Sequence, residues 1–85
     1  MNSTTPSGLP RDPGIPLAMV RPGCRVRLLA VHGGRGLVGR LSAMGLVPGV
    51  EIEVLNTNGA GPMVVKVMGS RLMLGRGLAQ KVLVN

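Results

Sequence analysis

Apolar and polar residues alternate along five short segments of this 85-residue chain, and such alternation is typical of strands that bury one face. The five segments are 24–31, 50–55, 63–68, 71–74 and 81–84. Only Gly69-Ser70 separates the third segment from the fourth, and a glycine followed by one more residue favours a tight hairpin with a type II′ turn. Five strands in so short a chain predict a mostly β fold, a small and strongly bent barrel.

The first predicted strand has one apolar and one basic face. Its apolar face holds Cys24, Val26, Leu28 and Ala30. Because an unpaired cysteine among apolar neighbours behaves as a small hydrophobe, we expect Cys24 to be buried. Arg25 and Arg27 alternate with these positions, so the exposed side of the strand begins with two positive charges.

One helix is predicted between the first two strands, over residues 37–44. Its apolar stripe recurs at positions i, i+4 and i+7 and consists of Leu37, Leu41 and Met44. Gly45 follows at once, and glycine takes the left-handed conformation of a helix end without a steric cost from Cβ. We therefore expect a positive φ at Gly45, with Leu46 folded back onto Leu41 as in the Schellman motif.

Residues 1–16 contain four prolines and two glycines, which predicts a flexible tail ahead of a single domain over 17–85. The tail lacks the apolar stretch of a signal peptide, and no apolar run in the chain approaches the ~20 residues that span a bilayer. A single cysteine fits a reducing compartment. We expect a cytoplasmic protein that does not insert into a membrane and meets one only through a partner.

The chain has no Phe, Trp or Tyr, so its core must be built from Val, Leu and Met. It therefore lacks the usual walls of a groove for proline-rich peptides and the usual stacking platforms for single-stranded nucleic acid. The formal net charge is nevertheless +7, which keeps a nucleic-acid-binding small β-barrel as the alternative function. The basic residues are spread singly and form no cluster, so we expect no nucleic-acid partner.

Catalytic groups are scarce, because the chain has one His, one Cys and no pair of carboxylates in an acid/base setting, and the sequence predicts a non-enzyme. Glu51 and Glu53 leave the same face of a predicted strand, where with His32 they could ligate a metal ion or could simply be solvated. A closed structural zinc site needs four ligands, usually Cys and His, and this chain cannot supply them alone. We therefore expect no required cofactor, and expect any divalent ion to bind weakly or to bridge a homodimer.

Two sets of residues together match one family pattern. The first lies in residues 17–49 and comprises Leu17, Pro22-Gly23, Arg40-Leu41, Met44-Gly45-Leu46 and Pro48-Gly49. The second lies in residues 61–84 and comprises Gly61-Pro62, Val65, Val67, Gly69, Leu72, Leu74, Ala79, Val82 and Val84. Over residues 17–85 the chain thus resembles the FeoA family, the small ferrous iron transport protein A, in its stand-alone form.

The resemblance implies a five-stranded SH3-like barrel with one short helix after the first strand, and a cytosolic accessory role in ferrous iron uptake. The implied partner is FeoB, a membrane transporter with a cytosolic GTPase domain, whose transport the protein would support or regulate. A barrel without aromatic residues must recognise this partner through aliphatic and Met contacts beside arginines. The favoured docking residues surround the helix end and are Leu37, Arg40, Met44, Leu46 and Val47. The second candidate surface is the basic strand face of Arg25 and Arg27.

Overall fold

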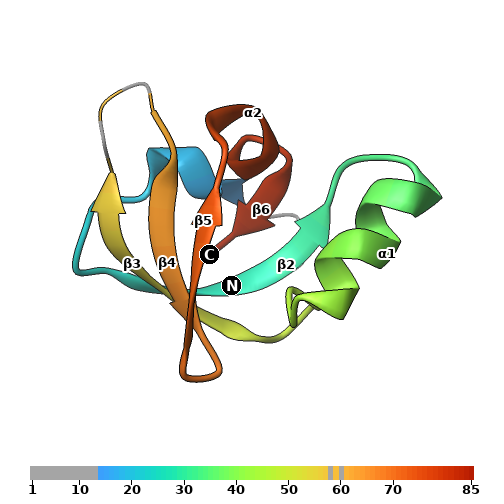
Figure 1. Cartoon of the computed structure of the whole chain (residues 1–85), viewed down its shortest axis with the longest axis horizontal. Coiled ribbons are helices and arrows are strands. Elements are labelled where there is room, and N and C mark those ends of the chain that lie inside the picture. Colours follow the sequence, from blue (N-terminus) through green and yellow to red (C-terminus); the bar gives the residue numbers. More distant parts are fainter. Residues whose placement is uncertain (1–13, 58, 60) are drawn as a thin grey trace, which may run out of the picture.

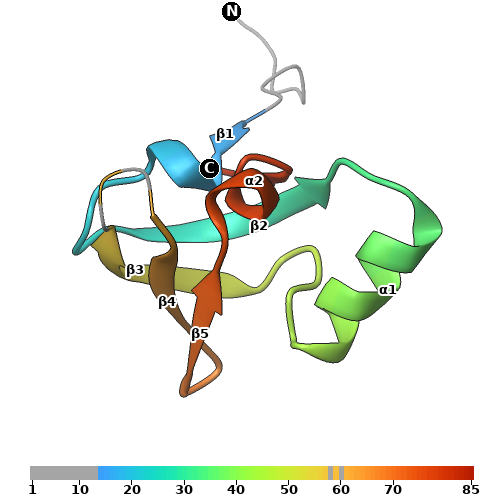
Figure 2. The ribbon, with the colours of Figure 1, turned by 45° about the horizontal axis from the view of Figure 1, so that its top comes forward.

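A computed structural model of the chain describes residues 14–57, 59 and 61–85. In chain order, its elements are β1 (Ile15–Pro16), the 3-10 helix η2 (Leu17–Met19), β2 (Arg25–Val31), α1 (Arg35–Ala43), β3 (Glu51–Thr57), β4 (Met63–Val67), β5 (Ser70–Leu74), α2 (Arg76–Ala79) and β6 (Val82–Val84). The strands form one antiparallel sheet in the order β1-β6-β2-β3-β4-β5, which curls into a small barrel with α1 outside it (Figure 1 and Figure 2). This confirms the predicted mostly β barrel with one helix between two strands. Among the described residues, no helix has the length and apolar character that crossing a membrane requires.

The sheet has one strand more than the five predicted. In β1, Ile15 lies opposite Val84 and Pro16 lies opposite Leu83 of β6. Both β1 residues fall within the predicted N-terminal tail, of which residues 1–13 lie outside the described part of the chain. Two residues are too few to show an alternating pattern, and an edge strand tolerates a proline because its outer amide needs no partner.

The burial predicted for the first strand is wrong at two of its four positions. Leu28 is buried and Val26 half-buried, but Cys24 and Ala30 are exposed. Cys24 lies outside β2, where its carbonyl accepts a hydrogen bond from the amide of Val54 at 3.0 Å. Ala30 follows a register shift between β2 and β6 at Leu28, and such a bulge interrupts the alternation of faces. Strict period-two reading therefore fails at both ends of this strand.

The turn between β4 and β5 is also not the one predicted. Val67 pairs with Ser70, so the two central residues are Met68 and Gly69, with φ of 52° and 83°. Positive φ at both positions defines a type I′ turn, not a type II′ turn at Gly69-Ser70. The two alternatives differ by one residue on each strand and bury the same side chains, so the apolar pattern could not separate them.

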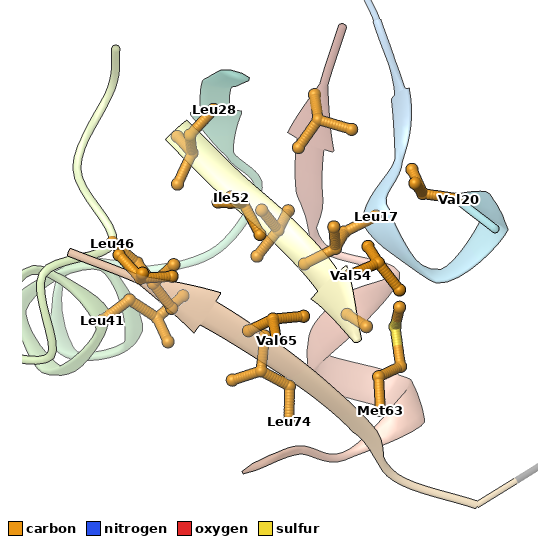
Figure 3. Packing of buried hydrophobic residues seen from close by; sticks show 14 residues of the cluster. Leu17, Val20, Leu28, Leu41, Leu46, Ile52, Val54, Met63, Val65 and Leu74 are labelled. Carbon is orange, nitrogen blue, oxygen red and sulfur yellow. The ribbon is translucent and has the colours of Figure 1, made fainter. Parts of the chain in front are cut away.

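The core is entirely aliphatic apart from one methionine, as a chain without aromatic residues requires. Its buried members come from every strand except β1 and from all three helices, and Figure 3 shows how they interdigitate. They are Leu17, Val20, Leu28, Leu41, Leu46, Ile52, Val54, Met63, Val65, Val67, Leu74, Ala79, Val82 and Val84. In the described part of the chain no polar or charged residue is buried, so the side chains of the interior interact by apolar packing.

Arg76, at the start of α2, joins segments that are distant in the sequence. Its Nη1 donates a hydrogen bond to the carbonyl of Ala18 at 3.0 Å, and its Nη2 donates to the carbonyl of Gly59. Its Nε is buried and has no hydrogen-bond partner among the described residues. The side chain thus ties η2 and the β3–β4 connection to α2, and it is a structural residue instead of one of the exposed positive charges.

Candidate docking surface

The end of α1 is fixed by the predicted Schellman motif. Gly45 has a φ of 92°, and its amide donates to the carbonyl of Ser42 at 2.9 Å. The amide of Leu46 donates to the carbonyl of Leu41, also at 2.9 Å. Leu41 and Leu46 are each 1% exposed and lie together in the core, as Figure 3 shows. These two bonds and one apolar contact are those of the motif, and they attach the helix end firmly to the barrel.

Because Leu41 and Leu46 turn inward, the residues beside them turn outward. Met44 is 40% exposed and Val47 is 39% exposed. Gly45 lies between these two residues and against the β4–β5 turn, since a Cβ built on it would be 3.8 Å from Sδ of Met68. Met68 itself is 79% exposed. We call the surface made by Met44, Gly45, Val47 and Met68 the methionine patch.

Met68 occupies a backbone conformation that costs free energy. Among the described residues it is the one non-glycine residue with a positive φ. A side chain with a Cβ is disfavoured in this left-handed region, and Asn or Gly is the usual choice at the first central position of a type I′ turn. The chain instead places a large apolar side chain there, where it gains little burial. Strain of this kind, kept at an exposed position, points to a function.

A groove of about 410 Å³ adjoins the methionine patch and shares Met68 with it. Its lining residues are Arg25, Val50, Glu51, Glu53, Lys66, Met68 and Gly69. The strand register places Glu53 opposite Arg25 on one side and opposite Lys66 on the other, so positive and negative side chains alternate across β2, β3 and β4. Patch and groove together offer an apolar ridge beside a mixed-charge surface, which is the chemistry of a protein contact and not of catalysis.

The candidate metal ligands are only partly brought together. Glu51 and Glu53 line the same groove, as their spacing predicts. His32 is exposed just after β2, where its main-chain amide donates to the carbonyl of Lys81 at 2.7 Å, and it does not line the groove. Within the part of the chain that the structure describes, no three His, Cys, Asp or Glu residues form a group able to hold a metal ion. Weak or intermolecular binding of a divalent ion stays a prediction.

The predicted docking residues divide by burial. Leu46 belongs to the core and cannot contact a partner through its side chain, and Leu37 is half-buried against the core. Arg40 is exposed in the last turn of α1. On the alternative surface Arg25 and Arg27 are both exposed, but Nη1 of Arg27 already donates to the carbonyl of Gly49 at 2.9 Å. The exposed part of the first set is therefore Arg40, Met44 and Val47.

Met68 was not among the predicted docking residues. The predicted type II′ turn placed it inside a strand, where an apolar residue needs no explanation. The available signal was the dipeptide Met68-Gly69 between two alternating segments, because a hairpin centred there requires a positive φ at a methionine. Its neighbourhood with Gly45 could not be read from the sequence, since 23 positions separate the two residues.

The sequence and the fold of this chain are similar to those of known proteins. The FeoA domain family matches residues 15–85. The chain is 36% identical over 70 residues to an Fe(2+) transport protein A assigned to Methanocaldococcus jannaschii, covering 82% of this chain and 84% of the relative. It superposes on the crystal structure of an iron uptake regulatory protein (FeoA) with a TM-score of 0.79 at 37% identity, covering 84% of this chain and 95% of that one. A solution structure of a Chlorobium tepidum FeoA protein gives a TM-score of 0.76 at 28% identity, covering 84% and 69%.

Proposed function

This chain belongs to the FeoA family of ferrous iron transport-associated proteins, and from that premise we propose that it docks through the methionine patch on the cytosolic part of the transporter FeoB. In this role the protein lies in the cytoplasm and supports or regulates the uptake of ferrous iron into the cell. The family is non-enzymatic, in keeping with the scarcity of catalytic groups in the chain. The protein therefore acts by contact.

The observation that carries this proposal is the strained, exposed Met68 beside the rigid end of α1. A methionine is unbranched and has three side-chain torsions, so it adapts to irregular apolar surfaces. Two exposed methionines, Met44 and Met68, lie next to Gly45. The Schellman motif holds Met44 and Val47 in place before binding, which reduces the entropy that an interface loses on ordering. Retaining an apolar residue where Asn or Gly would stabilise the turn is what a binding requirement would produce.

Arg40 supplies the charged edge of this surface. It is exposed in the last turn of α1, where a positive charge also interacts favourably with the helix dipole. A guanidinium next to an apolar patch favours a partner surface on which carboxylates surround an apolar pocket. We therefore expect an acidic rim on the docking face of the transporter.

Replacing Met68 separates binding from folding. Met68→Asn creates the Asn-Gly pair that a type I′ turn prefers, so we expect the free energy of unfolding to rise by about 0.5–1 kcal/mol. The same change removes the apolar contact, so the affinity for the cytosolic domain of FeoB should fall. Thermal unfolding and isothermal titration calorimetry with that domain measure the two effects.

Met19→Asn is the matched control, because Met19 is 69% exposed on η2 and lies outside the patch. It should leave the affinity unchanged. Wild-type affinity of the Met68→Asn protein, with the expected gain in stability, would remove the methionine patch from the proposed interface.

Arg40→Glu tests the charged edge. We expect it to abolish capture of the cytosolic domain of FeoB while lowering the melting temperature only slightly, because Arg40 is exposed, lies outside the core and loses only a weak surface interaction with the helix dipole. Arg35→Glu, at the other end of the same helix, should bind as the wild type does. If Arg40→Glu still binds and the pair Arg25→Glu and Arg27→Glu does not, the basic face of β2 is the docking surface instead.

A further inference from the structure

One edge of the sheet ends in β5, and its outer main-chain groups point away from the rest of the barrel. In the strand order β5 comes last, and its one strand neighbour in the described chain is β4. The two-residue turn makes Val67 and Ser70 a hydrogen-bonded pair, so the next such pairs are Val65 with Leu72 and Met63 with Leu74. The amides and carbonyls of the intervening Arg71 and Met73 therefore face outward.

Nothing in the described part of the chain uses these outward groups. Neither Arg71 nor Met73 has a main-chain hydrogen bond to a turn, loop or helix of that part. Both residues are exposed, and Met73 has 67% of its surface accessible. Natural edge strands are normally blocked by a proline, a bulge or several charges, and β5 has only Arg71. The edge is thus open to another strand.

The charges next to this edge show what kind of strand would fit. Across the sheet, the register places Arg25 opposite Glu53, Glu53 opposite Lys66, and Lys66 opposite Arg71. The alternation of charge ends at the edge, because Lys66 and Arg71 are both positive. They form a non-hydrogen-bonded pair, and in such pairs the side chains of the two strands come closest. Like charges directly opposite are unfavourable, and a carboxylate beyond Arg71 would relieve them.

The second outward position of β5 has a different chemistry. Met73 lies opposite Val64, which is half-buried on the same face, two residues from Lys66 along β4. An apolar side chain added beyond Met73 would extend this apolar row. A strand paired with β5 would therefore meet a cation at one position and an apolar surface two residues away.

We propose that β5 accepts an extended segment of a partner protein as a seventh strand of the sheet. The segment carries an acidic residue opposite Arg71 and an apolar residue two positions away, opposite Met73. Main-chain hydrogen bonds to Arg71 and Met73 supply affinity, and the two side-chain positions supply selectivity, as in other cases of strand addition. This edge contains no residue of the methionine patch, and the proposal does not require the transporter to be the partner.

A second copy of the chain fits this edge poorly. Antiparallel pairing of two β5 strands would place the Arg71 of both copies on one face of the extended sheet, each next to its own Lys66 and with no carboxylate between them. Each copy also has a formal charge of +7, so approach of the two is repelled. An acidic partner segment has the opposite charge and is attracted to the same edge.

The probe is a synthetic peptide that repeats Glu-Thr-Val-Thr, so that a glutamate and a valine stand two positions apart on one face, and it is added to the whole chain. By amide hydrogen exchange, the amides of Arg71 and Met73 should exchange fast in the free protein and become protected with the peptide, while the paired amide of Leu72 is protected throughout. N-methylation of the peptide amides that face β5 should abolish binding, whereas N-methylation of the alternate amides should not. Arg71→Glu should weaken binding by about tenfold or more, and Arg35→Glu should not.

Three results would overturn the proposal. The first is unchanged exchange at Arg71 and Met73 with saturating peptide. The second is equal binding of a peptide with lysine in place of each glutamate, which would show that the charges do not select the occupant. The third is protection of the same two amides in the free protein together with a dimer in analytical ultracentrifugation, which would make a second copy the occupant.

Discussion

A single glycine determines the shape of the proposed docking surface. Gly45 ends α1 in the left-handed conformation, is followed by Leu46 in the core, and lies next to the side chain of Met68. A methyl group at Gly45 would be in ordinary contact distance of Met68 and Val67, so space alone does not require a glycine there. The requirement comes from the backbone, because a residue with a Cβ is strained at a φ of 92°.

Gly45→Ala should therefore lower the free energy of unfolding by about 1 kcal/mol or more. Gly39→Ala is the matched control, since Gly39 lies inside α1 and a Cβ there meets nothing within 4 Å. It should raise stability by about 0.5–1 kcal/mol because alanine is the better helix former. Thermal melts followed by circular dichroism measure both, and equal melts for Gly45→Ala and the wild type would contradict the conformational explanation.

At the scale of elements, α1 is a weak helix that the barrel holds in place. It has nine residues, two of them glycine, its N-cap Gly34 makes no side-chain cap, and its first turn has no acidic residue. A helix this short is marginal in water without tertiary contacts. Leu41 is its one fully buried residue, so the contact of Leu41 with Leu46 secures both the helix and the patch at its end.

Leu41→Ala should cost about 2–5 kcal/mol, because it opens a cavity in a core with no aromatic residue to fill it. Leu37→Ala should cost less, since Leu37 is only half-buried. Urea unfolding followed by circular dichroism compares the two. A loss from Leu37→Ala as large as that from Leu41→Ala would show that α1 is held along its length.

The sequence predicted the elements whose signals are local. The end of α1 is determined by six consecutive residues, 41–46. The apolar alternation that predicts β3 and β4 can likewise be read within each strand alone. The turn of the β4–β5 hairpin was misplaced because two registers bury the same side chains, and the bulge in β2 leaves no mark in the pattern. The methionine patch and the groove each join segments that are distant in the sequence. Met44 and Val47 of the patch, Arg40 beside it, and Arg25, Glu51 and Glu53 of the groove were predicted singly, but Met68, which patch and groove share, was not.

At the scale of the whole molecule, the barrel is closed by hydrogen bonds from one side chain as well as by its core. Arg76 donates to the carbonyls of Ala18 and Gly59, which belong to segments 58 and 17 positions away. Hydrogen bonds from a charged donor contribute more than neutral ones. The side chain of Arg76 thus holds together segments that are distant in the sequence, in addition to the contacts of the small core.

Arg76→Leu should therefore destabilise the fold by about 1–3 kcal/mol, because it leaves two carbonyls without their donor. Arg71→Leu, at an exposed position of β5, is the control and should change stability by less than about 0.5 kcal/mol. Denaturant melts of the two variants give the comparison. Equal stability of Arg76→Leu and the wild type would mean that water replaces these bonds at no cost.

The position of β6 has a consequence for how the protein is made. This strand lies between β1 and β2 in the sheet, yet it follows every other element along the chain. Until the ribosome has added β6, the strands β1 to β5 already exist in the nascent chain, but the strand that joins β2 to β1 is missing. The nascent chain must keep these apolar faces apart from other chains until Val82–Val84 emerge, so translation of the last element, and not of the first, decides when this barrel can fold.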